Sequence, residues 1–232
     1  MILSANQPYF LPYFPYWQLI DCADMYLIAD YYSYIKKHWI TRNYILVKDK
    51  PIRLGLTVRN ASFHRTIKDT FLLPPFRENL AKTVRMAYHS APFFEDGYKL
   101  FEKITSYEND NLCDFLSFSI KEVCSYLGIT TKIGYTSDFE GNNLLKKEQR
   151  IYDFCKRAGA DTYVNAIGGQ DIYSFEDFAK HGIRLRFLRS TVEPYKQFWN
   201  PFVSNLSVID AIMFCSKEQL SKMLSQRTFI DE

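Results

Sequence analysis

The first thirty residues contain two short apolar segments on either side of a helix-like one, and this order restricts the possible folds. Residues 2–5 (ILSA) and 25–30 (MYLIAD) have the length and apolar character of buried strands. The segment between them, 16–24 (YWQLIDCAD), has helical spacing. Strand, helix and strand in so short a stretch form a βαβ unit, whose two strands run parallel in one sheet. We therefore predict a mainly parallel sheet with the first strand inside it.

Strands and helices alternate again from residue 131 onward. Glycine follows two of the expected helices, in AGAD and HGI, where helices commonly end, and SKEQ at 216–219 fits a capping box. The expected strands are 131–136, 161–165 and 182–188, and the expected helices are 146–158, 174–181, 205–214 and 216–226. About five parallel strands with helices between them predict a Rossmann-like, doubly wound α/β fold.

The middle of the chain interrupts this alternation. Apolar runs at 43–47 and 52–58 flank the turn sequence KDKP, which predicts a hairpin. The segment 77–127 is rich in helix formers and has two breaks, near SAPFF and near YENDN, so we expect three helices there. We therefore expect a single α/β domain over residues 1–232 that carries a helical subdomain at about 77–127.

Charge and cysteine usage limit the classes of partner. The 29 basic and 26 acidic residues are mixed along the chain, and the net charge of +3 gives no support to binding of nucleic acid or an anionic membrane. No apolar segment has the length of a membrane span, and no signal peptide is recognisable, so we expect a cytoplasmic protein.

The five cysteines are scattered without a C-x-x-C pair, which indicates reduced thiols rather than a zinc site. We expect neither a metal nor another cofactor, and the oligomeric state stays open.

The stretch QPYFLPYFPYW at 7–17 is the most unusual in the chain, since it holds three of the nine prolines and six aromatic residues. Proline fixes φ and lacks the N–H donor, and the residue before it is pushed toward extended backbone, so this run is a stiff, extended loop. It is either a preorganised wall of a ligand pocket or a hydrophobic connection packed against the core. An open α/β sheet binds ligands beyond the carboxyl ends of its strands, and this position favours the pocket wall.

Polar residues gather where three expected strands end. Neutral amides at Asn6 and Gln7 can both donate and accept hydrogen bonds. Arg42 offers a planar fork to a carboxylate or phosphate, although a structural salt bridge would use it equally well. The N–H groups of Gly168 and Gly169 could hold an anion, or the pair could form an ordinary turn. The candidate substrate-binding residues from these stretches are Asn6, Gln7, Tyr9, Trp39, Arg42, Asn43, Gly168 and Gly169.

Four blocks of the chain, in order, resemble the WbqC-like proteins of bacterial surface-polysaccharide gene clusters. The matching residues are Gln7, Pro8, Phe10, Leu11, Pro12 and Tyr16 in an H-Q-P-x-F-L-P-W block; Lys36, Trp39, Arg42 and Asn43 in a basic W-x-x-R-N block; Tyr88, Ala91, Pro92, Phe93 and Phe94 in a Y-x-x-A-P-Y-F block; and Tyr195, Gln197, Phe202, Leu206, Ser207 and Asp210 near the end. Asn6, Tyr13 and Pro15 replace the family's histidine, tryptophan and glycine. The Asn6 replacement removes a candidate general base, because an amide does not titrate.

The resemblance implies a role in O-antigen or capsule synthesis, with aminoacyl (glycyl) transfer to an amino sugar as a proposed activity. It also adds Tyr195 and Gln197 to the substrate-binding candidates. Two hypotheses of different kinds follow, and the sequence leaves open whether the protein is an enzyme.

In the first hypothesis the protein is a group transferase acting on a sugar nucleotide, a lipid-linked sugar or an amino sugar. Arg42 and Lys36 would hold diphosphate, and Asp210 or His38 would move a proton, so the catalytic candidates are Asp210, His38 and Lys36. In the second it is a non-catalytic binding or scaffold protein whose aromatic loop anchors a partner. The first hypothesis expects one cleft that gathers Asn6, Gln7, Trp39, Arg42, Asn43, Tyr195 and Gln197.

Overall fold

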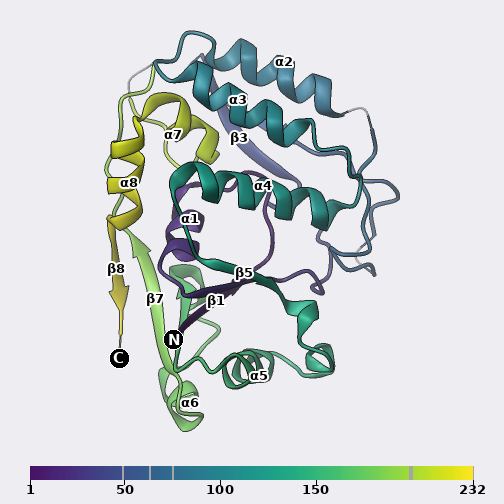
Figure 1. Ribbon diagram of the computed structural model, residues 1–232, viewed down its shortest axis with the longest axis vertical. Helices are drawn as coiled ribbons and strands as arrows, with labels where there is room; N and C mark the ends of the chain where they lie inside the picture. The colour runs from purple at the N-terminus through teal and green to yellow at the C-terminus, as the bar shows by residue number, and fades with distance from the viewer. Residues whose placement is uncertain (49, 63, 75, 199–200, 232) are drawn as a thin grey trace.

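A six-stranded sheet forms the centre of the protein in the computed structural model, which describes residues 1–48, 50–62, 64–74, 76–198 and 201–231 (Figure 1). Across the sheet the strands follow the order β5-β2-β1-β6-β7-β8. Their bounds are Ile2–Asn6 (β1), Met25–Ile28 (β2), Lys132–Tyr135 (β5), Thr162–Ala166 (β6), Arg184–Ser190 (β7) and Arg227–Ile230 (β8). Neighbouring strands are parallel except for β7 and β8. The predictions of a mainly parallel sheet and of an internal first strand are confirmed.

Side chains of the strands enter two separate layers of core. On β2, Leu27 packs with Phe154 and Phe178 on one face, whereas Tyr26 and Ile28 pack on the other. Successive residues of a strand point to opposite faces, so both faces of this sheet need a cover of helices. The first face is covered by α5 (Glu148–Ala158) and α6 (Phe175–Lys180), and the core of the second includes α1 (Phe14–Asp21), α4 (Leu112–Leu127), α7 (Val208–Phe214) and α8 (Lys217–Ser225). The fold is therefore the expected α/β arrangement.

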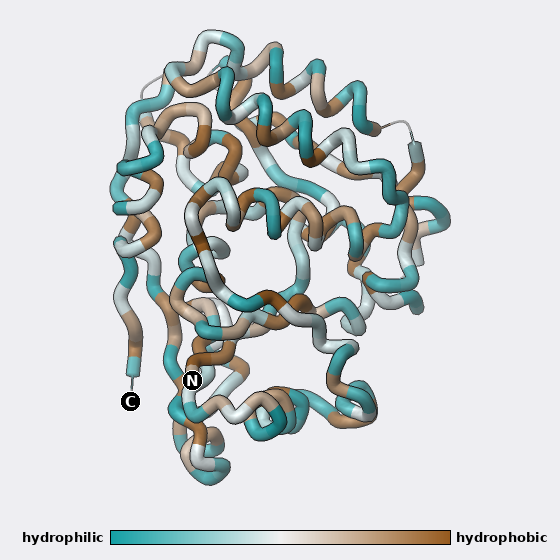
Figure 2. The backbone as a smooth tube through the Cα atoms, in the orientation of Figure 1, coloured by the Kyte–Doolittle hydropathy of each residue, from teal (hydrophilic) through white to brown (hydrophobic). Residues whose placement is uncertain are grey.

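Three helices occupy the segment in which three were expected, namely α2 (Phe76–Tyr88), α3 (Phe94–Thr105) and α4. Figure 2 shows apolar and polar residues alternating along them, as in amphipathic helices. The side chain of Asn111 accepts a hydrogen bond from the Asp114 N–H at the start of α4, and Gly128, with φ of 75°, ends this helix. Phe101 of α3 belongs to the same buried cluster as Tyr26 of the sheet, so these helices extend the central core.

A separate two-stranded antiparallel sheet follows the first βαβ unit. Its strands are β3 (Arg42–Val47) and β4 (Lys50–Gly55), and they form the expected hairpin. Short 3-10 helices lie at Thr136–Asp138 (η1), Asn142–Leu144 (η2) and Ile167–Gly169 (η3). All five cysteines are free thiols, and no described helix is both long and apolar enough to span a membrane.

The sequence did not predict β8, which closes one edge of the sheet. Its four residues, RTFI, are too few and too polar to resemble the buried strands. The strand is tied to β7 by a bidentate ion pair, in which the guanidinium of Arg186 donates to Asp231 from Nε at 2.6 Å and from a terminal nitrogen at 3.0 Å. Pairing with β7 and this ion pair thus add an antiparallel last strand, whose Phe229 and Ile230 are only partly buried against the core.

Candidate functional site

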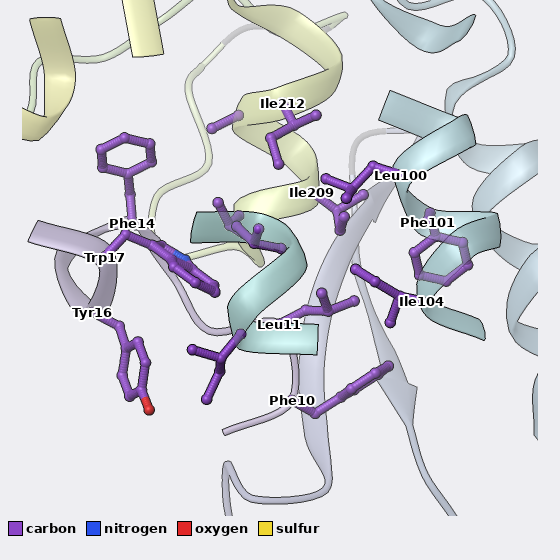
Figure 3. Close-up of a cluster of buried hydrophobic side chains, with 14 of the residues drawn as sticks. Phe10, Leu11, Phe14, Tyr16, Trp17, Leu100, Phe101, Ile104, Ile209 and Ile212 are labelled. Atoms are coloured by element: carbon purple, nitrogen blue, oxygen red, sulfur yellow. The ribbon is translucent and has the colours of Figure 1, made fainter. Parts of the chain in front are cut away.

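The middle of the proline-rich loop belongs to the core. Phe10 and Leu11 are fully buried, and Figure 3 shows them among side chains of α3 and α7. The ring of Phe10 lies 6.3 Å from that of Phe115, centroid to centroid. For this part of the loop the expectation of a pocket wall is wrong, because the apolar rings gain more from burial in the core than from contact with solvent or a ligand.

A set of hydrogen bonds fixes the backbone of this loop at Leu11, whose φ of 44° is rare for a residue with a side chain. The Leu11 carbonyl oxygen accepts from the Asn43 side-chain amide at 2.7 Å and from the Ser207 hydroxyl at 2.8 Å. The same amide also donates to the carbonyl of Phe10 at 3.2 Å. Asn43 is buried and its amide is used by the loop, so the structure gives it a structural role in place of the expected substrate contact.

Asp210 lies at the centre of a second buried network. Its carboxylate accepts hydrogen bonds from the hydroxyls of Tyr88 at 2.8 Å and Tyr195 at 2.7 Å, and from the Gln197 amide at 2.7 Å. Burial raises the pKa of the Asp210 carboxyl, although these three donors oppose the rise. The side chain is fully buried and lines none of the cavities described below, so this arrangement holds three segments together rather than presenting an acid to a ligand.

A cavity of about 360 Å³ opens where β1 and β6 end, and we call it the switch-point cavity. The chain leaves β1 toward β2 on one side, whereas β6 pairs with β1 on the other, so the strand order reverses here. Such a reversal leaves a crevice at the carboxyl ends of the strands, where doubly wound proteins bind ligands. The cavity is lined by Ala5, Asn6, Gln7, Tyr9, Ala29, Tyr32, Ile151, Tyr163, Asn165, Ala166, Gly168, Gly169, Ile172 and Tyr173. Five of the candidate substrate-binding residues therefore share this cavity: Asn6, Gln7, Tyr9, Gly168 and Gly169.

Two asparagines near the carboxyl ends of β1 and β6 line the switch-point cavity and make the same local hydrogen bond. The Asn6 side-chain oxygen accepts from the N–H of Gln7 at 2.8 Å, and that of Asn165 accepts from the N–H of Ala166 at 2.9 Å. Their side-chain nitrogens have no hydrogen-bond partner among the described residues, and neither has the Gln7 amide. Asn165 was not expected from the sequence. The sequence held a signal for it, because Asn165 lies in the last two residues of β6 and Asn6 is the last residue of β1.

Tyrosines supply the rest of the polar lining. Burial raises the pKa of Tyr9 and of Tyr173 to about 12, and it also raises the pKa of Tyr32, so these hydroxyls stay protonated at neutral pH. The Arg150 guanidinium lies over the face of the Tyr32 ring, 4.5 Å from its centroid, in a cation–π contact. No Asp, Glu, Lys, Arg or His occurs among the described residues that line this cavity. Its chemistry is therefore that of neutral hydrogen-bonding groups and aromatic faces.

The two neighbouring glycines, Gly168 and Gly169, differ in how closely they pack against Asn165. A methyl group on Gly169 would collide with the Asn165 side-chain amide, whereas one on Gly168 would meet no atom within 4 Å. The pair lies in the 3-10 helix η3, which follows β6 directly. Gly169 is thus needed for close packing of the Asn165 amide, and this supports a turn that shapes the cavity rather than an anion cradle.

Arg42 and Lys36 line a different cavity, of about 460 Å³, on the outer side of the β3–β4 hairpin, which we call the hairpin cavity. Arg42 lies 5.8 Å from the centroid of the Trp39 ring, which is exposed. Neighbouring residues of a strand point to opposite faces, so Arg42 faces outward where Asn43 faces the core. The expectation that these residues share one cleft with Gln7 and the last block of the sequence is therefore wrong.

His38 lies between the two cavities. Its ring is 5.7 Å from that of Tyr9, centroid to centroid, in an edge-on arrangement. Partial burial lowers the pKa of His38, and the charge of Arg42 lowers it further, so the imidazole is held neutral. Tyr195 borders a third and smaller cavity of about 230 Å³, beside Tyr13 and Ser207. Within the described part of the chain, no group of three or more His, Cys, Asp or Glu residues lies in an arrangement that could hold a metal ion.

Comparison with known proteins relates nearly the whole chain to one family. The model of a family described as the WbqC-like protein family matches residues 7–222. The uncharacterized protein Rv1507c of Mycobacterium tuberculosis (strain ATCC 25618 / H37Rv) is 25% identical over 214 residues, which cover 90% of this chain and 92% of that protein. No solved structure matches. The sequence blocks that resemble the family meet in the interior, because Asn43 and Ser207 hold the loop at Leu11, and Tyr88 shares Asp210 with Tyr195.

Proposed function

Because this chain belongs to the WbqC-like protein family, we propose that it binds a sugar nucleotide or an amino sugar in the synthesis of a bacterial surface polysaccharide such as O-antigen or capsule. The observation that supports this proposal is the lining of the switch-point cavity. A sugar offers many hydroxyls that accept and donate hydrogen bonds, together with apolar faces that pack on aromatic rings. The free amides of Asn6, Gln7 and Asn165 and the neutral phenols of Tyr9 and Tyr173 fit that chemistry.

Binding without catalysis agrees better with the cavity than group transfer does. General acid–base catalysis needs a titratable group within hydrogen-bonding reach of the reacting atom. The three catalytic candidates lie elsewhere: Asp210 is buried in its network, Lys36 lines the hairpin cavity, and His38 lies behind Tyr9. The groups that line the switch-point cavity hold and orient a ligand, and we therefore favour a sugar-binding component of the polysaccharide machinery.

One observation favours the second candidate, an aminoacyl transferase that acts on an amino sugar. The Nδ1 atom of His38 is buried and has no hydrogen-bond partner in the described structure, and the imidazole is neutral. A neutral imidazole next to Tyr9 could accept a proton through the tyrosine hydroxyl once a ligand fills the cavity. In that case Tyr9 is the group that touches the substrate and His38 is the base behind it.

Isothermal titration with UDP-N-acetylglucosamine, other nucleotide-linked amino sugars and the free amino sugars tests the proposal. We expect at least one of the free amino sugars to bind, and Asn165→Ala to weaken its binding roughly tenfold through loss of the side-chain amide donor. The matched control is Asn79→Ala, at an exposed position on α2. Equal binding by Asn165→Ala and the control would disprove the assignment to this cavity. Mass analysis of the sugar after incubation with glycine donors then separates the two candidates, because only a transferase changes its mass.

A further inference from the structure

Basic residues are concentrated in one segment of the chain, although the net charge of the whole chain is small. Eight of the 29 basic residues but only one of the 26 acidic residues fall within 36–65, so the remainder of the chain holds 21 basic and 25 acidic residues. The expectation of charges mixed along the chain is therefore wrong. Segment 36–65 includes the hairpin and the loop that leads into it. A positive field concentrated on one segment attracts anions to that segment even when the net charge is small.

The register of the hairpin places two arginines on one face. Arg42 pairs with Gly55, and Tyr44 pairs with Arg53. Directly paired residues of an antiparallel ladder point to the same face, as do residues two apart on one strand, so Arg42 and Arg53 project from the same outer face. Gly55 has no side chain to fill the space opposite Arg42. The hairpin cavity forms in this space, and Lys36 and Lys37 from the preceding loop complete its cationic lining.

None of these four cations is neutralised by the described part of the protein. Among the described residues, no carboxylate forms an ion pair or hydrogen bond with the side chain of Lys36, Lys37, Arg42 or Arg53, and the buried Nε atom of Arg42 has no partner there. Like charges gathered around one cavity repel each other, and a buried guanidinium nitrogen without an acceptor costs free energy. An anion with several oxygens would correct both defects at once, since an arginine fork binds two oxygens of one group.

We propose that the hairpin cavity binds the diphosphate group of a nucleoside diphosphate or of a lipid-linked diphosphate. Two guanidinium forks and two ammonium groups match the several charged oxygens of a diphosphate better than the two oxygens of a single carboxylate. The four cations line one cavity instead of forming a stripe, which fits a compact anion rather than a long polyanion. This site goes beyond the proposed sugar binding, because it uses different residues and needs no sugar.

Titration of the full chain with inorganic pyrophosphate at low ionic strength tests the site directly. We expect Arg42→Gln and Arg53→Gln each to lower the affinity for pyrophosphate roughly tenfold or more, because the contacts are charge-assisted. Added NaCl should lower the affinity of the wild type as well, because salt screens such contacts. The matched control is Arg189→Gln, which removes the same charge from an exposed position on β7. Arg53 is exposed, so its variant keeps the test valid even if Arg42→Gln fails to fold.

Two further arms identify the source of the diphosphate. UDP is titrated in solution, and sedimentation is measured with phosphatidylcholine vesicles that carry a polyprenyl diphosphate, with pure phosphatidylcholine vesicles as the blank. Binding in either arm that depends on Arg42 and Arg53 supports the proposal and names the source. Equal pyrophosphate affinity in Arg42→Gln, Arg53→Gln and Arg189→Gln, or no binding by the wild type, would overturn it. Tight binding of an oligothymidylate that pyrophosphate does not displace would also overturn it, in favour of a nucleic-acid surface.

The two proposals fail independently. Gly169→Ala alters only the switch-point cavity, so it should leave pyrophosphate affinity unchanged, and Arg53→Gln should leave the affinity for a free amino sugar unchanged. Loss of sugar binding in Arg53→Gln together with loss of pyrophosphate binding would show that the two cavities are not separate sites, which contradicts the inference.

Discussion

The side-chain amide of Asn43 donates a hydrogen bond of 2.7 Å to the carbonyl oxygen of Leu11, which is 32 positions earlier in the chain. This contact joins the first strand of the hairpin to the proline-rich loop at the residue where the loop has positive φ. It explains why two neighbouring residues of the hairpin have opposite tasks: Asn43 organises the interior, and Arg42 faces the hairpin cavity.

We predict that Asn43→Ala destabilises the protein by about 1–3 kcal/mol, because it leaves the buried carbonyls of Phe10 and Leu11 without this donor. Urea unfolding measures the change, with Asn79→Ala as the exposed control. A loss no larger than that of the control would mean that Ser207 alone is enough to hold the loop.

Asp210→Asn tests the second network through its pH dependence. Burial raises the folded-state pKa of Asp210 above the ordinary value of 3.8, so the folded protein holds this proton more tightly than the unfolded chain does. The resulting stability is fully present below that ordinary value and is lost as the pH rises through the folded pKa. We therefore expect the advantage of the wild type over Asp210→Asn, in free energy of unfolding, to shrink as the pH rises from below 3.8 toward neutrality.

The measurement is urea unfolding of both proteins across that range, with Asp171→Asn at an exposed position as the control. An advantage that grows with pH would show that the three hydrogen bonds to the carboxylate outweigh its burial.

The unequal glycine pair gives a matched test of the switch-point cavity. In Gly169→Ala the new methyl group displaces the Asn165 amide, whereas in Gly168→Ala it points into open space. Neither position is among the glycines with positive φ, so backbone strain does not enter the comparison. We expect sugar binding to fall at least several-fold in Gly169→Ala and to be preserved in Gly168→Ala, as measured by titration, with melting temperatures as the check on folding. The reverse order would show that the Asn165 amide does not face the ligand.

The tyrosine hydroxyls of the cavity predict a flat pH profile for binding. Since burial raises the pKa of Tyr9 and Tyr173 to about 12, both remain donors well above the pH at which an exposed tyrosine ionises. The affinity for an uncharged amino-sugar derivative should be the same at pH of about 8 and about 10. A fall in affinity over this interval that disappears in Tyr9→Phe would show that Tyr9 ionises in an exposed, water-filled cavity.

Local sequence patterns were enough to predict most of the strands and helices of the fold. Parallel pairing of the first two strands followed from the apolar character of 2–5 and 25–30 and from the helix between them. Glycines at 128, 159 and 182 have positive φ and each follows the end of a helix. The strand β8 could not be predicted in this way, because it depends on pairing with β7 and on the Arg186–Asp231 ion pair, which join distant parts of the chain.

Topology alone explains why some of the candidate residues share the switch-point cavity. Asn6, Gln7 and Gly169 follow parallel strands, and the carboxyl ends of such strands necessarily meet. The motif residues from the later blocks could not be placed, because a motif does not show which face of a strand or helix a side chain occupies. Asn43 was expected to contact the substrate and Asp210 to move a proton, and both are instead buried hydrogen-bonding residues.

The pairing of β1 with β6 brings together Ile2 and Thr162, so the switch-point cavity depends on segments made far apart in time. At synthesis rates of roughly 5–20 residues per second, β1 leaves the ribosome about 10–30 s before β6. In that interval β1 can pair with β2 on one side only, and the backbone N–H and C=O groups on its other edge stay unpaired. The nascent chain thus exposes an open strand edge, and such an edge can pair with another chain and lead to aggregation. The cavity therefore cannot form until β6 has been made, although its first wall is among the earliest residues of the chain.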